Sequence, residues 1–182
     1  SQMLSQETWS SELSFSAMNG LLANTITKES VRLLQKMNFT HFDIPLVSSD
    51  PVLRKALGRP ILSNEQFLKV LLLLKSVGRP VHVYYIAGMP GQLLEDCLEC
   101  ARMLFLCGVQ QYISPFYPLP GSEIYRDLHS KGLVCAEKWA QYRTSAFLSF
   151  SEDISCLDLV SLFRWGQLLN RIAVSGEEEW QR

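Results

Sequence analysis

The loop Gly88-Met-Pro-Gly-Gln92 combines the residue types that let a main chain bind a small molecule. Its two glycines allow close approach of the backbone to a ligand, and a helix beginning near Gln92 would direct its first N–H groups at a polar or anionic group. A tight turn that needs a positive φ explains the same glycines equally well. The loop follows residues 80–87, whose β-branched and aromatic side chains predict a strand.

The cysteines predict core packing. Cys97, Cys100 and Cys107 share one face of a helix predicted over residues 92–107. Cys97-Leu-Glu-Cys100 has the spacing of a metal or redox pair, but zinc takes four ligands, and the other cysteines and the histidines supply no second close pair. Five is an odd number, which argues against a disulfide framework. We therefore expect reduced thiols and no metal ligand set.

The histidines have two interpretations. His82 and Tyr84 lie on one face of the predicted strand 80–87, because side chains alternate along a strand. They contact a substrate if that face points into the fold, whereas a lone histidine in a strand is more often a hydrogen-bonded structural residue. The same two interpretations apply to His41, and His129 is expected on a helix surface.

Apolar periodicity and turn signals divide most of the chain into alternating strands and helices. The predicted strands are residues 12–17, 40–47, 80–87 and 110–117, and the predicted helices are residues 27–37, 50–58, 65–77, 92–107 and 122–129. This alternation is typical of βα units, whose strands pair in parallel. The sequence therefore predicts an α/β fold with about four consecutive βα units.

Ligands of such folds bind where the strands end, at their carboxyl edge. That rule selects four loops, which are residues 19–24, 47–50, 88–92 and 118–122. After Gly132 the alternation weakens, with an additional strand predicted at 145–151 and an amphipathic helix at 157–174. We therefore divide the chain into residues 1–133 and a C-terminal helical appendage, residues 134–182, that packs on the first part.

Charge and hydropathy exclude several classes of function. The 17 basic and 18 acidic side chains give a net charge of −1, so no polybasic surface for nucleic acid or an anionic membrane is expected. The apolar runs are too short to span a bilayer, and the first residues lack the basic and apolar regions of a signal peptide. We expect a cytoplasmic protein that acts on a small molecule.

Five stretches together resemble the radical S-adenosylmethionine (SAM) enzymes, and among them the group often fused to a cobalamin-binding domain. The stretches are Leu13 to Leu21, Ile26 to Leu34, Ser49 to Arg59, Tyr85 to Gln92, and Tyr112 to Tyr125. The resemblance covers roughly residues 12–133. It implies a partial TIM-like barrel formed by the third to sixth βα units of the family's six.

The resemblance implies a set of cofactor contacts at two strand ends. Gly88 and Gly91 match the glycine motif whose backbone lies against the nucleoside of SAM. Ile113 and Ser114 match a strand from which main-chain contacts to adenine are expected.

A third set of implied contacts follows the strand 40–47. Relatives often carry glutamate or glutamine before a serine there, whereas this chain has Val47 before Ser48, so Ser48 restores the contact only in part. Arg59 matches a basic position that can contact a carboxylate, and a solvated loop arginine is the alternative.

The resemblance further implies a 4Fe-4S cluster that cleaves SAM to a 5′-deoxyadenosyl radical, with cobalamin supplied through another domain. The CxxxCxxC motif of the family's first unit has no counterpart, because no cysteine precedes Cys97. The first hypothesis is therefore the C-terminal portion of a radical SAM enzyme, inactive alone.

Two rival hypotheses remain. One is a degenerate, non-catalytic binding or assembly module, and the weaker one is an ordinary barrel enzyme that binds phosphate at residues 88–92. Without the preceding units of the barrel, the strand at 12–17 would present an unpaired edge, and the inner face of the half-barrel would expose apolar side chains. We expect homodimerisation through the exposed edge, or the C-terminal segment, to cover them.

Overall fold

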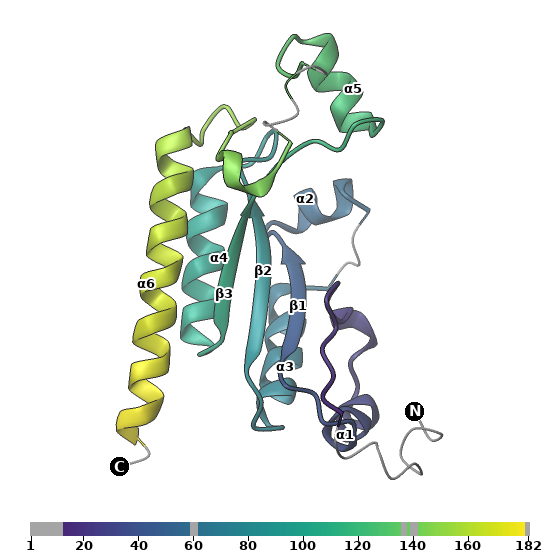
Figure 1. Ribbon diagram of the computed structural model, residues 1–182, viewed down its shortest axis with the longest axis vertical. Coiled ribbons are helices and arrows are strands. Elements are labelled where there is room, and N and C mark those ends of the chain that lie inside the picture. Colours follow the sequence, from purple (N-terminus) through teal and green to yellow (C-terminus); the bar gives the residue numbers. More distant parts are fainter. Residues whose placement is uncertain (1–12, 59–61, 136–137, 139–141, 181–182) are drawn as a thin grey trace.

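The structure, a computed structural model, describes residues 13–58, 62–135, 138 and 142–180. Its centre is a sheet of three parallel strands in the order β1 (Phe42–Val47), β2 (Val81–Ala87) and β3 (Gln110–Pro115) (Figure 1). The main helices that connect them are α3 (Asn64–Lys75) and α4 (Leu94–Leu106). The α/β fold class and the partial barrel predicted from the sequence are confirmed.

Shorter elements surround the sheet. The helices α1 (Lys28–Lys36) and η3 (Ala23–Thr25) precede β1, α2 (Pro51–Ala56) follows it, and α5 (Glu123–Ser130) follows β3. The C-terminal part contains η5 (Thr144–Ala146) and α6 (Cys156–Trp180). No helix in the described ranges is both long and apolar enough to cross a membrane.

Local capping fixes where the helices begin. The Asp50 carboxylate accepts hydrogen bonds from the first amides of α2, and Pro51 occupies the first helical position. Ser63 caps α3, accepting from the amide of Gln66 while the Gln66 side chain accepts from the amide of Ser63. The helix therefore begins at Asn64, one residue before the predicted range 65–77, because Ser63 forms the complete capping box.

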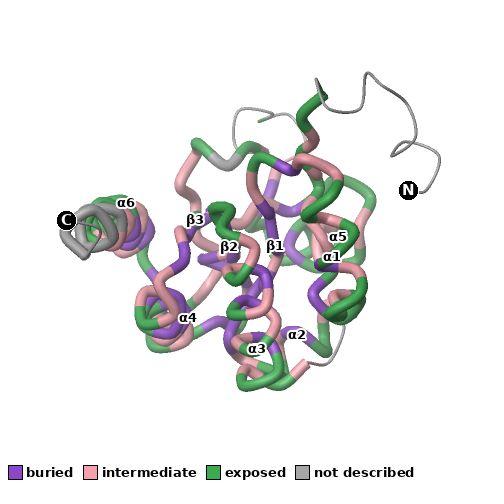
Figure 2. The backbone as a smooth tube through the Cα atoms, turned by 90° about the horizontal axis from the view of Figure 1, so that it is seen from below, coloured by how far each residue is buried: buried purple, intermediate pink, exposed green. Residues whose placement is uncertain are grey.

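The sheet buries one face and leaves the other open. Phe42, Ile44 and Val83 are fully buried and pack with Leu71 of α3 and Leu104 of α4. Strand alternation places the neighbouring residues on the opposite face, which we call the open face and define by Asp43, Pro45, His82, Tyr84, Ile86, Gln110, Tyr112 and Ser114. Figure 2 shows α3 and α4 on a single side of the three strands.

The first predicted strand, residues 12–17, is wrong as a regular strand in its described part. Phe15 forms only an isolated parallel bridge to Phe39. Further along, the amide of Leu21 donates to the carbonyl of Asp43 at 2.7 Å, so Asp43 directs its backbone groups to this edge of β1. Pro45, two residues on, faces the same edge and has no N–H to donate, so a continuous ladder cannot form.

The C-terminal segment covers the opposite edge of the sheet. The described residues 145–151 form no strand, which corrects that prediction, and the helix predicted at 157–174 is part of α6. The Asn170 side chain accepts from the amide of Gln111 and donates to its carbonyl, both at 2.8 Å. These two bonds satisfy backbone groups that a neighbouring strand would otherwise take. Homodimerisation and the boundary at residue 133 stay predictions.

Candidate functional site

The loop after β2 is closed by its own glutamine. Gln92 is buried, and its Oε1 accepts from the amides of Gly88 (2.8 Å) and Met89 (3.2 Å), while its Nε2 donates to the carbonyl of Ile86 at 2.9 Å. Gly88 has φ +86° and Gly91 has φ +72°, as a tight turn requires. The amides expected to face a ligand therefore have partners within the loop.

The first amides of α4 also have partners. The amide of Leu93 donates to Asp96 at 3.1 Å, and that of Leu94 donates to Asp153 at 2.7 Å. Two carboxylates thus occupy the position where an anion would bind. This arrangement disfavours the hypothesis of a phosphate at residues 88–92.

Gly88 and Gly91 differ in what surrounds them. A Cβ at Gly88 would lie 3.2 Å from a methyl carbon of Leu159 and 3.3 Å from Ser149 Oγ, and the Gly88 carbonyl accepts from the amide of Phe150 at 2.9 Å. A Cβ at Gly91 would meet nothing within 4 Å. In this structure it is therefore the C-terminal segment that lies close to the backbone of Gly88.

The predicted contacts after β1 are buried polar residues. Ser48 Oγ accepts from the amide of Asp50 at 3.1 Å. Ser49 Oγ donates to the carbonyl of Asp96 at 2.9 Å, and its amide donates to Cys100 Sγ at 3.0 Å. These bonds hold the end of β1 against α4. Arg59 lies outside the described residues.

A buried arginine at this strand end escaped the sequence analysis. Arg54 of α2 is 4% exposed and borders a cavity of about 40 Å³ together with Val47 and Leu62. Its Nη2 donates to the carbonyl of Leu62 at 2.9 Å, and its Nε has no hydrogen-bond partner in the described part of the chain. Burial lowers the pKa of this guanidinium.

Ile113 and Ser114 point to opposite faces of β3. Ile113 is buried on the face that α3 and α4 cover, and its side chain lies 3.3 Å from the Cβ position of Gly166 in α6. Ser114 pairs with Ile86 on the open face. The parallel register brings the ends of β1, β2 and β3 to one edge, so the predicted strand-end loops share that edge.

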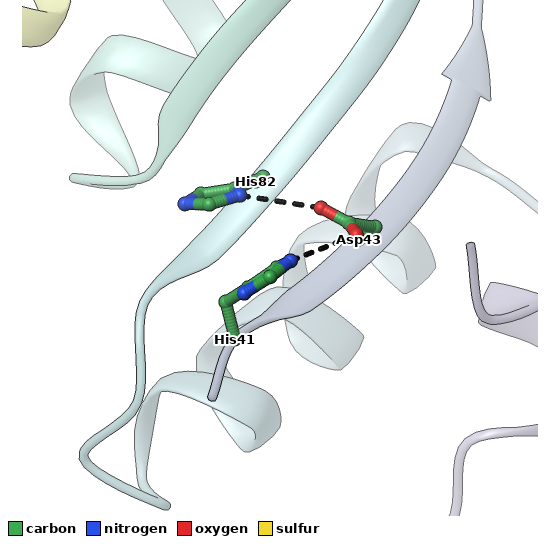
Figure 3. Close-up of side chains that lie close together, drawn as sticks. All are labelled: His41, Asp43 and His82. Atoms are coloured by element: carbon green, nitrogen blue, oxygen red, sulfur yellow. Dashed lines mark hydrogen bonds and ion pairs between the residues drawn. The ribbon is translucent and has the colours of Figure 1, made fainter. Parts of the chain in front are cut away.

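The open face carries a second group of polar residues, which we call the His-Asp-His cluster: His41, Asp43 and His82. His41 Nε2 lies 3.1 Å from Asp43 Oδ2, and His82 Nδ1 lies 3.2 Å from Asp43 Oδ1 (Figure 3). The two imidazole rings stack with centroids 4.8 Å apart. The sequence placed both histidines in strands but gave no sign of this contact, because His82 meets Asp43 only through the β1–β2 register.

Aromatic side chains extend the cluster along the open face. The rings of Tyr84 and Tyr112 stack at 5.1 Å, and Tyr112 contacts His82 edge-on at 5.3 Å. Burial raises the pKa of Tyr84 to about 12, with the Asp43 carboxylate as a further cause. Burial lowers the pKa of His82, which the Asp43 carboxylate opposes. The Tyr84 phenol and the His82 imidazole are therefore neutral at neutral pH.

The cysteines of α4 do not fit an iron–sulfur cluster. Cys97 and Cys100 are fully buried between α4 and the sheet, as the sequence predicted. Burial raises the pKa of Cys97 to about 12 and that of Cys100 to about 11. Cluster ligands are thiolates, and these two thiols are held protonated within the apolar core.

Thiol labelling tests this assignment. At pH 8 we expect a maleimide to modify the exposed Cys156 rapidly and to leave Cys97 and Cys100 unmodified, because the reactive thiolate is scarce and inaccessible there. Mass spectrometry of tryptic peptides identifies the labelled positions, and labelling in denaturant provides the fully modified control. Equal labelling rates at Cys97 and Cys156 in the native protein would contradict the buried placement.

The fold and the matched sequence together define the class of protein. A half-barrel of parallel βα units with a glycine loop after β2 is the arrangement that the resemblance implied. A sequence model described as the radical SAM superfamily matches residues 14–104, half of the chain. The chain belongs to the radical SAM superfamily. No curated protein sequence matches it.

Solved structures with a similar fold include two radical SAM enzymes. The radical SAM methyltransferase TsrM from Kitasatospora setae, solved with cobalamin and a 4Fe-4S cluster bound, is 16% identical with a TM-score of 0.53 over 60% of this chain and 22% of that one. Coproporphyrinogen III oxidase (HemN) from Escherichia coli is 12% identical with a TM-score of 0.49 over 68% of this chain and 28% of that one. This chain therefore corresponds to under a third of either structure.

Proposed function

We propose that this chain forms the later βα units of a radical SAM enzyme whose cluster is held by another part of the protein. The observation that carries the proposal is the family match over residues 14–104, which falls on a parallel sheet with the expected strand-end loops. In the family, the cluster and SAM together supply a 5′-deoxyadenosyl radical, which removes hydrogen from a substrate. The residues of this chain would shape the cavity in which that occurs.

The role of the chain follows from what its strand ends and open face offer. Ser114, at the carboxyl end of β3, carries a hydroxyl on the open face, close to where the family binds SAM. The stacked rings of Tyr84 and Tyr112 on the same face suit a planar or apolar small-molecule substrate. Cobalamin is proposed only through another domain, by analogy with the cobalamin-bound TsrM structure.

Anaerobic reconstitution with iron and sulfide tests whether the chain acts alone. We expect no stoichiometric 4Fe-4S absorbance and no 5′-deoxyadenosine from SAM and dithionite, because Cys97 and Cys100 are protonated and buried. A reconstituted radical SAM enzyme with an intact CxxxCxxC motif serves as the positive control. Reductive cleavage of SAM by this polypeptide alone would overturn the proposal that another part of the protein holds the cluster.

A non-catalytic module is the second candidate. It is favoured by Val47, whose side chain cannot hydrogen-bond SAM, and by the Gln92 side chain that fills the loop after β2. Gene sequence upstream of the first codon separates the two candidates. An in-frame CxxxCxxC motif supports the enzyme, whereas an upstream stop codon with no such motif supports the module.

A further inference from the structure

We propose that the His-Asp-His cluster binds a divalent first-row transition metal ion through His41 Nε2, an Asp43 carboxylate oxygen and His82 Nδ1. This site lies on the open face and uses none of the cysteines. The inference does not depend on the proposed radical SAM function, because it rests on side chains that the β1–β2 pairing brings together.

The strands place the three ligands on one side of the sheet. His41 immediately precedes β1 and Asp43 lies two residues later, so strand alternation puts both side chains on the same face. The parallel register pairs Asp43 directly with His82 of β2. Figure 3 shows the two imidazoles one above the other on the same side of the carboxylate, each directing a ring nitrogen at it.

The distances between the ligand atoms suit a metal ion. Zinc binds imidazole nitrogen and carboxylate oxygen at about 2.0–2.2 Å, so neighbouring ligand atoms in a tetrahedral site lie about 3.3 Å apart. The two nitrogen–oxygen distances to Asp43 are 3.1 and 3.2 Å, and the ligand atoms of the three residues all lie within 4.8 Å of one another. His41 faces Oδ2 and His82 faces Oδ1, so a bound ion would require the side chains to turn toward a common point.

Thr40 holds His41 in the orientation that a metal ligand needs. Its hydroxyl lies 3.4 Å from the carbonyl of Phe15, to which it can donate, and 2.8 Å from His41 Nδ1, from which it can then accept. That tautomer leaves the lone pair of Nε2 directed at Asp43. In the other tautomer the Thr40 hydroxyl donates to Nδ1 and Nε2–H donates to Asp43 at 3.1 Å, and a metal ion would take the place of that proton. Metal-bound histidines generally have such a hydrogen bond at the second nitrogen.

The charge balance favours a cation at this place. The Asp43 side chain is 10% exposed and lies within hydrogen-bond distance of both histidines, and within the described residues no lysine or arginine forms an ion pair with it. A divalent ion at this place would bring positive charge to the buried carboxyl group. The side chains of His82 and His41 are 17% and 30% exposed, so an ion can enter from the open face.

The ligand set selects the class of metal. Imidazole and carboxylate together suit zinc and ferrous iron, whereas magnesium and calcium prefer oxygen ligands alone. Three protein ligands leave at least one coordination position open, as in catalytic rather than structural sites. That position faces the side of the sheet on which Tyr84 and Tyr112 stack, where water or a substrate oxygen could coordinate.

The experiment titrates the chelator-treated chain with Zn²⁺ by calorimetry and, anaerobically, with Fe²⁺, which distinguishes the two metals. Titration with Co²⁺ followed by visible absorption reports the ligand type. We expect one ion per chain and a cobalt spectrum without thiolate charge transfer. His82→Asn, which keeps a hydrogen-bond donor beside Asp43, should weaken binding at least about tenfold, as should Thr40→Val.

The matched control is His129→Asn, because His129 is exposed on α5 and distant in sequence from the cluster. It should leave the affinity unchanged, and circular dichroism should give the same fold for all three variants. Absence of binding, an affinity that His82→Asn does not change, or thiolate charge transfer in the cobalt spectrum would overturn the proposal. A cluster held together by hydrogen bonds alone would give the first of these outcomes.

Discussion

Replacing Leu71 with alanine is expected to lower the free energy of unfolding by about 2–5 kcal/mol. Leu71 is 0% exposed in α3 and packs into the core beneath β1 and β2. Its truncation removes apolar contacts and leaves a cavity that rigid strands on one side cannot fill. Urea unfolding followed by tryptophan fluorescence and circular dichroism measures the change.

The neighbouring Leu72 provides the matched control. It has the same side chain on the same helix but is 58% exposed, so Leu72→Ala should change the free energy of unfolding by less than about 0.5 kcal/mol. Similar losses for both variants would show that α3 does not pack on the sheet through the face described above. Comparison of Leu71→Ala with Leu72→Ala thus tests how α3 packs on the sheet and needs no activity assay.

The second large effect is expected at Gly88, where alanine should destabilise the protein by about 2–4 kcal/mol. The backbone has φ +86°, a conformation that alanine adopts only with strain. The added methyl group would also press on Leu159, which is 1% exposed and closely packed. Thermal and urea unfolding of the purified variant give the size of the loss.

Gly91→Ala separates the two causes. Gly91 has φ +72° and open space where a Cβ would be, so its replacement should cost only the backbone strain, about 1–2 kcal/mol. Equal losses at the two positions would mean that the C-terminal segment does not press on Gly88. Calorimetric titration of each folded variant with SAM tests separately whether the two glycines contact the cofactor, as the family implies.

The His-Asp-His cluster and the strand-end loop at Gly88 lie at different positions along the strands of the sheet. His82 is near the start of β2, while Gly88 follows its end, a separation of about 20 Å at the usual rise of a strand. The strand ends are the place where the family binds SAM, and the His-Asp-His cluster lies toward the opposite end of the open face. The stacked rings of Tyr84 and Tyr112 lie on the open face between these two regions.

Local patterns were enough to predict most elements. The strands at 40–47, 80–87 and 110–117 contain β1, β2 and β3, and α1 to α5 lie where apolar periodicity and caps placed them. The exceptions have physical reasons. Residues 13–17 cannot extend the sheet beside Pro45, and residues 145–151 have no strand edge to join at β3, because Asn170 of α6 occupies that edge.

The sequence by itself determined the family, the parallel βα order and the burial of Cys97 and Cys100, because each depends on spacing along the chain. Only the tertiary structure decided that Gln92 fills its own loop and that the C-terminal segment, rather than a ligand, lies against Gly88. It also decided that His82 meets Asp43, since residues 39 positions apart come together only through strand register. Parallel strands are joined by a long crossover and not by a tight turn, so the packing of that crossover on the sheet helps to set the register.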